Sequence, residues 1–225
     1  MVVRIKTGIP GLDRLMQGGL IKGSVYLLTG GTGTGKTIFG CQFLWYGLQK
    51  GETCVYITLE EDPVDIREDV RNFGWDFEKF EKKGLCKIIY IDPVSTSNIN
   101  TEIMNHIKKL DARRLVIDST AVMGMGMEKE SLIRRRVFSI INALKTHDDC
   151  TTLIISEIPE ETKKLSRFGV EEFVVDGVIV LNYLGIGEEY NRSLMVRKMR
   201  RTTHGKDVYP FEVTEKGLIV RKSEV

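Results

Sequence analysis

The sequence of residues 30–37 is Gly30-Gly31-Thr32-Gly33-Thr34-Gly35-Lys36-Thr37. It follows an apolar run at Ser24–Thr29 and leads into a helical pattern at Thr37–Lys50, the setting that a phosphate-binding loop requires. In such a loop, glycines let successive backbone N–H groups turn toward a β-phosphate, and the helix adds the positive end of its dipole. A glycine-rich turn without a ligand is the alternative, but average composition gives the whole pattern by chance in roughly one chain of this length per hundred. The residues expected to bind the nucleotide are Gly31, Thr32, Gly33, Thr34, Gly35, Lys36 and Thr37.

Two side chains of this loop have distinct expected roles. Lys36 is expected to reach the β- and γ-phosphates, and the Thr37 hydroxyl is expected to ligate Mg²⁺. A carboxylate that ends a neighbouring apolar strand commonly completes such a magnesium site, and the run Arg114–Asp118 ends in one. Asp118 on its own is equally compatible with a helix cap or a turn. Beside this loop it is predicted to hold Mg²⁺, directly or through another ligand, so ATP and Mg²⁺ are the expected cofactors.

A pair of glutamates, Glu60 and Glu61, ends the apolar run Thr53–Leu59. The carboxyl ends of parallel strands form the ligand edge of a sheet, so one of the pair can face the γ-phosphate. Because side chains alternate along a strand, one is predicted to orient the attacking water as a base while the other supports it, and Glu60 is preferred as the base. The alternative is that both merely precede a helix N-terminus, which stabilises acidic residues. That explanation suits Asp62 and Asp65 better.

The rest of the chain supports an α/β fold. Apolar runs alternate with helical patterns, as in a largely parallel sheet that helices cover on both faces. Helices are expected at Pro63–Phe73, with Asp62 as N-cap, and after Glu130, where an apolar stripe has helical spacing. Past residue 177 only short loops join the strands, which predicts antiparallel hairpins at one sheet edge. The further expected strands are Lys87–Ile91, Leu115–Asp118, Thr152–Ser156, Gly177–Tyr183, Ser193–Met199, Tyr209–Val213 and Gly217–Val220.

Length and composition set further limits. A chain of 225 residues with 42% hydrophobic and 28% charged residues fits one globular domain, expected over residues 1–225. No apolar run is long enough to cross a membrane and no signal-peptide core begins the chain, so a cytoplasmic protein without membrane contact is expected. The net charge of +2 gives no electrostatic reason for a nucleic-acid partner. The scattered cysteines predict neither zinc nor disulfides; buried, free thiols are expected at Cys41, Cys54, Cys86 and Cys150.

Several stretches together resemble the KaiC-type ATPases of the RecA/RadA superfamily. The resemblance covers essentially the whole chain, as one copy of a domain that the cyanobacterial clock protein carries twice. It implies a RecA-like P-loop NTPase core, with a mostly parallel central sheet flanked by helices and C-terminal antiparallel hairpins. The stretches that carry it are Thr7–Asp13, Gly18–Leu20, Gly30–Thr37, Leu59–Glu61, Val116–Ser119, Phe168–Gly177 and Lys198–Arg200, with Thr202, His204, Tyr209, Pro210 and Phe211.

The resemblance also implies a homo-oligomeric ring, usually a hexamer, with ATP at each subunit interface. Family members use the glutamate pair for hydrolysis and send a Lys-x-Arg and a nearby His from the adjacent subunit to the γ-phosphate. The matching positions are Lys198, Arg200 and His204. A strand through Ser193–Met199 projects residues 198 and 200 to one face, as two cations on one phosphate require. Alternatively, the basic residues here only protect an exposed sheet edge from aggregation.

Three functions stay open at this stage. The preferred one is an ATP-hydrolysing ring that regulates or signals, with a regulatory protein as partner. The second is an accessory protein that binds DNA in recombination or repair. It rests only on Arg134–Arg136 and on the loop with Lys163, Lys164 and Arg167, which lacks aromatic residues for base stacking. The third is an assembly protein clamped by nucleotide with little turnover.

Two polar residues lie at the end of one expected strand, and two hydroxyl residues follow Asp118. Ser156 and Glu157 occupy the place where superfamily members put a polar residue that senses the γ-phosphate, although an acidic residue does not suit a direct contact. No single position matches the phosphate acceptors of the clock protein, and Ser119 and Thr120 follow Asp118 too closely to serve. These residues therefore give no support for autokinase activity and leave the question open.

Overall fold

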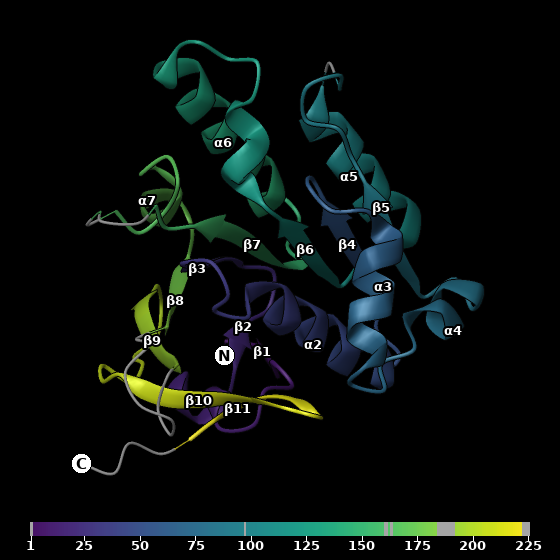
Figure 1. Ribbon diagram of the computed structural model, residues 1–225, viewed down its shortest axis with the longest axis vertical. Coiled ribbons are helices and arrows are strands. Elements are labelled where there is room, and N and C mark those ends of the chain that lie inside the picture. The colour runs from purple at the N-terminus through teal and green to yellow at the C-terminus, as the bar shows by residue number, and fades with distance from the viewer. Residues whose placement is uncertain (1, 97, 160–161, 163, 184–191, 222–225) are drawn as a thin grey trace.

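The computed structural model describes residues 2–96, 98–159, 162, 164–183 and 192–221. Within these residues the centre is a nine-stranded sheet with the strand order β11-β10-β9-β8-β3-β7-β6-β4-β5, and β1 pairs with β2 in a separate small sheet (Figure 1). The strands are β1 (Arg4–Ile5), β2 (Leu20–Ile21), β3 (Val25–Gly30), β4 (Cys54–Thr58), β5 (Cys86–Tyr90), β6 (Arg114–Asp118), β7 (Thr151–Glu157), β8 (Gly177–Tyr183), β9 (Arg192–Met199), β10 (Tyr209–Thr214) and β11 (Gly217–Val220).

From β8 to β5, all neighbouring strands of the main sheet run parallel. The residues of β3 and β4 are buried along their whole length, because helices cover both faces of the sheet. In register, Gly30 lies opposite Glu157 and Thr58 lies opposite Asp118. The carboxyl ends of β3, β4, β6 and β7 therefore meet at one edge, which we call the ligand edge. The expected parallel sheet is confirmed, with strand ends displaced by single residues.

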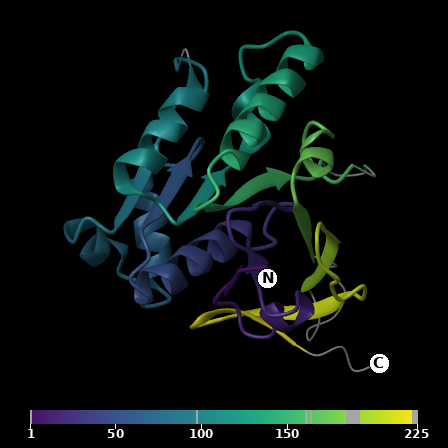
Figure 2. The same ribbon diagram turned by 180° about the vertical axis from the view of Figure 1, so that it is seen from behind.

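Two layers of helices enclose the sheet, and each has its own apolar core (Figures 1 and 2). On one face lie α1, α2, α3 and α4, and on the other lie α5, η1, α6 and α7. The expected helices at α2, α3 and α6 are confirmed, including Asp62 as the N-cap of α3. The bounds are α1 (Leu12–Leu15), α2 (Lys36–Gln49), α3 (Pro63–Arg71), α4 (Phe77–Lys82), α5 (Ile99–Leu110), η1 (Thr120–Gly124), α6 (Glu130–Lys145) and α7 (Glu171–Val174).

The C-terminal strands extend the sheet beyond β3. The expected antiparallel pairs are present, because β8 pairs with β9, β9 with β10 and β10 with β11 in antiparallel fashion. The structure adds that β8 itself runs parallel to β3. This arrangement brings the start of β9 to the ligand edge and its end to the opposite edge of the sheet. No helix in the described part of the chain is long and apolar enough to cross a membrane.

Candidate nucleotide site

The glycine-rich loop connects β3 to α2 at the ligand edge. Gly33 and Gly35 have φ values of 72° and 92°, a backbone region that side chains with a Cβ rarely occupy. The Thr34 hydroxyl donates to the Gly31 carbonyl at 2.9 Å, and Lys36 Nζ donates to the same carbonyl at 2.8 Å. The loop is thus closed on itself around the first turn of α2, with its lysine folded over it. This is the strand-loop-helix arrangement that the sequence predicts.

Lys36 is a buried cation, with 9% of its surface exposed. Burial lowers the pKa of its ammonium group, while the carboxylates of Glu157, Asp118 and Glu60 act in the opposite direction. The fold therefore brings a lysine and three carboxylates from separate segments of the chain within electrostatic range of one another. An anionic ligand beside Lys36 would add the negative charge that a desolvated ammonium lacks.

Asp118 ends β6 and receives two hydrogen bonds. Its Oδ2 accepts from the Thr37 hydroxyl at 2.8 Å and from the Tyr56 hydroxyl at 2.6 Å. Burial raises the pKa of this carboxyl group, and the bonds from Tyr56 and Thr37 act against that rise. Tyr56 is a residue that the sequence analysis missed, because within the apolar strand β4 it is indistinguishable from a core aromatic.

The pair of Thr37 and Asp118 fits a magnesium ion. Mg²⁺ takes hard oxygen ligands, and in nucleotide sites it is held by one or two protein groups together with phosphate oxygens and water. A hydroxyl and a carboxylate in contact, next to a phosphate-binding lysine, are such a set. In the described ranges no three His, Cys, Asp or Glu side chains gather into a metal-binding group. One hydroxyl and one carboxylate leave the other coordination positions of a magnesium ion to phosphate oxygens and water.

Glu60 and Glu61 lie just past the end of β4, in a bend rather than in the strand itself. The Ser119 hydroxyl donates to Glu60 Oε1, whereas Glu61 is fixed through its backbone, which exchanges hydrogen bonds with Thr58 Oγ1. Because the strand ends at Thr58, strict alternation does not govern the directions of these two side chains. The separate contacts distinguish them instead.

The two carboxyl groups also differ in their electrostatic surroundings. Desolvation is the main cause that raises the pKa of each. For Glu60 the charges of Asp118 and Glu157 act in the same direction, while the Ser119 bond and Lys36 oppose them. For Glu61 the charges that add to this rise are those of Asp118, Asp69, Glu60 and Asp65. Glu60 is thus the glutamate that interacts electrostatically with Lys36 and accepts a hydrogen bond from Ser119.

Ser156 and Glu157 at the end of β7 point to different neighbours. The buried Ser156 hydroxyl donates to Glu171 Oε1 at 3.2 Å, on the side of α7. Glu157 pairs in register with Gly30 and is the largest carboxylate influence on Lys36. Ser156, at the position expected to sense a phosphate, is therefore hydrogen-bonded to Glu171 of α7. Glu157 contributes negative charge near Lys36.

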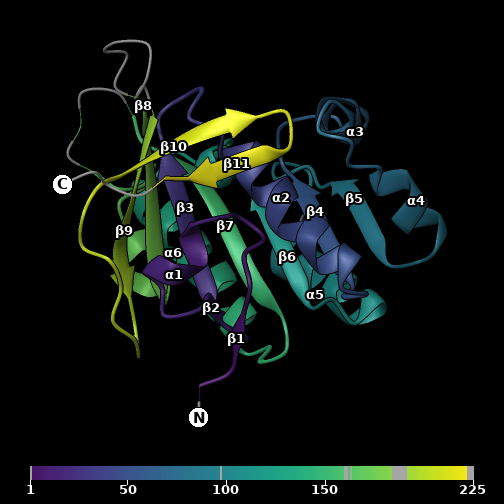
Figure 3. The same cartoon turned by 90° about the horizontal axis from the view of Figure 1, so that it is seen from below.

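Lys198 and Arg200 lie far from the loop of their own chain. The Arg200 N–H donates to the Asp176 carbonyl, and the Asp176 N–H donates to the carbonyl of Val25, the first residue of β3. At about 3.3 Å per residue, the length of β3 separates this level from Gly30 by about 17 Å. In Figure 3 the end of β9 and the loop between β3 and α2 lie at opposite ends of the strands. Neither side chain can reach a phosphate bound at its own loop.

The side chains of the two cations lie close to each other, although Arg200 follows β9 and is not part of the strand. Lys198 Nζ and Arg200 Nη2 both donate to the Phe173 carbonyl, at 3.3 and 3.0 Å. Their side chains therefore project from the same side of the sheet. His204 is placed differently: its Nδ1 lies 2.9 Å from the Gly205 carbonyl, and the Gly205 N–H donates to Leu15 of α1. No hydrogen bond joins His204 to either cation in the described residues.

Arg192 is a second residue that sequence reasoning missed. It begins β9 at the ligand edge, where its Nη2 donates to the Gly33 carbonyl at 3.4 Å. Its guanidinium carbon lies 5.1 Å from the centre of the aromatic ring of Tyr183, at the end of β8. The Nε of Arg192 is buried and has no hydrogen-bond partner within the described structure. In the sequence, Arg192 is a single arginine before an apolar strand. The basic residues at the end of β9 are more numerous and gave the stronger signal.

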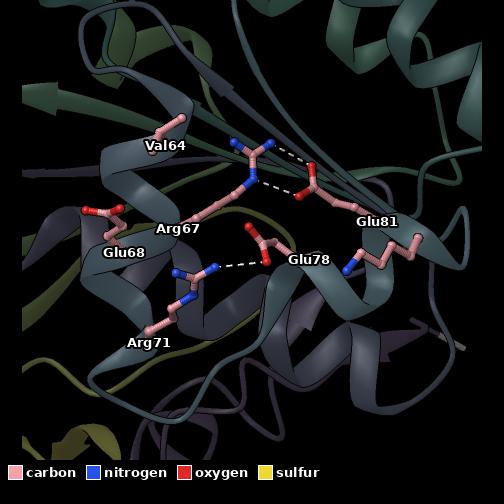
Figure 4. Close-up of a pocket in the computed structure, with 7 residues that line it drawn as sticks. Val64, Arg67, Glu68, Arg71, Glu78 and Glu81 are labelled. Carbon is pink, nitrogen blue, oxygen red and sulfur yellow. Dashed lines mark hydrogen bonds and ion pairs between the residues drawn. The ribbon is translucent and has the colours of Figure 1, made fainter.

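A separate cavity of about 350 Å³ lies between α3 and α4 (Figure 4). Its charges neutralise one another: Arg67 donates twice to the Glu81 carboxylate, at 2.7 and 2.8 Å, and Arg71 pairs with Glu78 at 2.9 Å. These pairs hold α3, the helix that follows Glu60 and Glu61, against α4. We assign the cavity a structural role.

Comparisons with known proteins agree with this geometry. The family described as "ATPase: KaiC" matches residues 5–225. A UPF0273 protein of Methanopyrus kandleri is 37% identical, over 100% of this chain and 94% of the relative. The circadian clock oscillator protein KaiC of Synechococcus elongatus is 36% identical over 96% of this chain, which spans 44% of that relative. The crystal structure of a KaiC-like protein from Pyrococcus horikoshii superposes with a TM-score of 0.90 and 42% identity, covering 99% of this chain and 100% of that one. The chain therefore belongs to the KaiC family of ATPases and has its RecA-like fold.

Proposed function

We propose that this protein binds and hydrolyses ATP with Mg²⁺ in a homo-oligomeric ring, whose active sites are shared between neighbouring subunits. The observation that carries this proposal is the placement of the charged residues. Lys36, Asp118 and Glu60 gather at the ligand edge, whereas Lys198 and Arg200 converge at the opposite edge. An active site that uses both sets requires two copies of the chain.

Within one subunit, the ligand edge supplies most of the chemistry. The backbone N–H groups of the loop and Lys36 bind the phosphates, and Thr37 with Asp118 holds the metal. When bound, Mg²⁺ neutralises charge on the β- and γ-phosphates. Glu60 orients the attacking water as a base, because it is the glutamate fixed by Ser119 and within range of Lys36. Glu61 supports this bend through its backbone bonds to Thr58.

The neighbouring subunit supplies the cations. Charge that develops on the γ-phosphate during transfer is stabilised by a basic finger, and such a finger commonly comes from another chain. Lys198 and Arg200 fit this role because they point to one place and cannot reach their own loop. His204 is proposed as a third residue that contacts the γ-phosphate, and this rests only on its match to the family pattern. A hexamer is the ring size that this match favours.

The biological role that we propose is regulatory or signalling, with a regulatory protein as partner. It rests on similarity to a protein whose name describes a circadian clock oscillator. The DNA-binding alternative has less support, because Arg134 pairs with Glu130 at 2.9 Å and Arg136 donates to the Pro93 carbonyl at 2.7 Å. Lys163 of the basic loop lies outside the described residues. The clamp alternative does not explain why a base candidate is fixed beside Lys36.

The test compares Glu60→Gln with Glu61→Gln. Glu60→Gln is expected to keep ATP affinity and lose most turnover, since the amide keeps the shape of the side chain and removes the base. Glu61→Gln is expected to keep substantial turnover, because the contacts that fix it come from its backbone. Normal hydrolysis by Glu60→Gln together with a dead Glu61→Gln would reverse the two roles. Normal hydrolysis by both would place the base elsewhere.

A further inference from the structure

The short helix α7 presents one strongly exposed aromatic side chain. Phe173 is 70% exposed, the largest exposed fraction among the large hydrophobic residues that the structure describes. Its neighbour Glu171 is 0% exposed. A helix of one turn thus has one residue fixed inside the protein and an apolar residue held out in solvent.

The buried side of α7 is fixed by hydroxyl groups from three segments. The carboxylate of Glu171 accepts from Thr120 and Ser156, each at 3.2 Å, and from Ser166 at 2.7 Å. Thr120 follows β6, Ser156 lies in β7, and Ser166 lies in the loop before the helix. A buried carboxylate is costly unless its oxygens are well satisfied, so these bonds select one orientation of α7. Phe173 is therefore presented by a rigid support.

The exposed side of α7 is tied to the two cations of β9. The Phe173 carbonyl accepts from both Lys198 and Arg200, while Lys198 also donates to the carbonyls of Glu172 and Val175 at 2.8 Å. The backbone of Phe173 therefore contacts both cations, so a surface that the cations approach also comes close to α7.

We propose that α7 is a contact between subunits and that Phe173 is its apolar anchor, buried against the ligand edge of the next copy of this chain. This inference rests on the proposed shared site, because only that site brings the cations to a neighbour. A ring needs two different faces that fit each other. The ligand-edge side carries exposed apolar residues, Val94 and Met125, and Val94 borders a cavity of about 570 Å³ between α5 and α6. Aromatic anchors in such positions commonly dominate the energy of an interface.

The experiment measures assembly of the full-length protein with ATP and Mg²⁺ by light scattering over a range of subunit concentrations. Phe173→Asp is expected to raise the concentration for half-assembly about tenfold or more, as truncation of an interface anchor does. Phe173→Leu is expected to remain close to wild type, because it keeps an apolar side chain. The control is Phe138→Asp, at a phenylalanine of α6 that is 50% exposed and does not line the cavity between α5 and α6; it should assemble like wild type.

Monomeric Phe173→Asp should still bind a fluorescent ATP analogue with the affinity of the monomeric wild-type protein, and its melting temperature should be unchanged. These results separate a lost contact from a lost fold. Assembly of Phe173→Asp at the wild-type concentration would overturn the anchor while leaving the ring intact. A wild-type protein that stays monomeric with ATP and Mg²⁺ would instead refute the proposed ring.

Discussion

Replacing Tyr56 by Phe removes the hydroxyl group that holds Asp118, a proposed magnesium ligand. The aromatic ring of the side chain stays in the core. The Tyr56 hydroxyl donates to Asp118 Oδ2 at 2.6 Å, and the residue is fully buried. A hydrogen bond to a charged group is worth about 1.5–3 kcal/mol. Loss of a partner that orients a metal ligand typically weakens metal binding about 10–100-fold. The bond from Thr37 remains, so we expect an effect near the lower end, about tenfold in the Mg²⁺ concentration for half-maximal turnover.

The same change should move the pH dependence in a defined direction. The bond from Tyr56 lowers the pKa of Asp118 against the effect of burial. Without this bond the pKa rises further, so a higher pH is needed to keep the carboxylate charged for the metal. The assay is steady-state ATP hydrolysis, titrated with Mg²⁺ at several pH values.

Tyr26→Phe is the matched control. The Tyr26 hydroxyl is also buried, but it accepts from the Ile21 N–H at 2.7 Å, away from Asp118. Its loss should lower the free energy of unfolding and leave the Mg²⁺ requirement unchanged. If Tyr56→Phe also leaves the Mg²⁺ requirement and the pH dependence unchanged, the proposal that Tyr56 positions Asp118 as a magnesium ligand is refuted.

Three further outcomes are expected. Lys36→Ala should abolish ATP binding or hydrolysis, as measured by equilibrium binding and phosphate release, because the phosphate charge is left uncompensated in a partly dry site; unchanged turnover at saturating ATP would refute the loop assignment. Turnover should fall on acidification at a pH above the ordinary glutamate pKa of 4.5, since burial raises the pKa of Glu60 and a protonated carboxyl is no base; a rate that holds steady through that range would exclude it as the base. The native thiols should resist a thiol reagent until the protein unfolds, because all are buried and burial raises the pKa of Cys150 to about 12; rapid labelling of the native protein would contradict this. They are Cys41, Cys54, Cys86 and Cys150.

Much of the central sheet could be predicted from the sequence, because its strands are buried on both faces and appear as short apolar runs. The helix α5 was missed although Ile99, Ile103 and Ile107 recur at helical spacing. Together with Met104 and Leu110 they form one apolar face that packs against the sheet, so this helix could have been predicted from the sequence. The helix α7 has only four residues, too few for any periodicity to appear.

The candidate site was predictable only where a motif fixes the chemistry. Lys36, Thr37 and Asp118 follow from the loop and from a strand that ends in a carboxylate. Tyr56 was not predictable as part of the site, because a tyrosine in an apolar strand has the same pattern whether or not its hydroxyl has a functional partner. The burial of Glu171 was equally hidden, since its hydroxyl partners come from three separate segments.

In the proposed ring, each active site takes its base and its phosphate cations from different subunits. The most direct measurement mixes two variants, Glu60→Gln and Lys198→Ala/Arg200→Ala, each expected to be nearly inactive alone. A basic finger is typically worth about 10³-fold or more in turnover. Under conditions that let subunits exchange, some interfaces pair an intact base with intact cations, so ATP hydrolysis should return and should fall again on dilution. No recovery at any mixing ratio, with exchange shown independently by labelled subunits, would contradict the shared site.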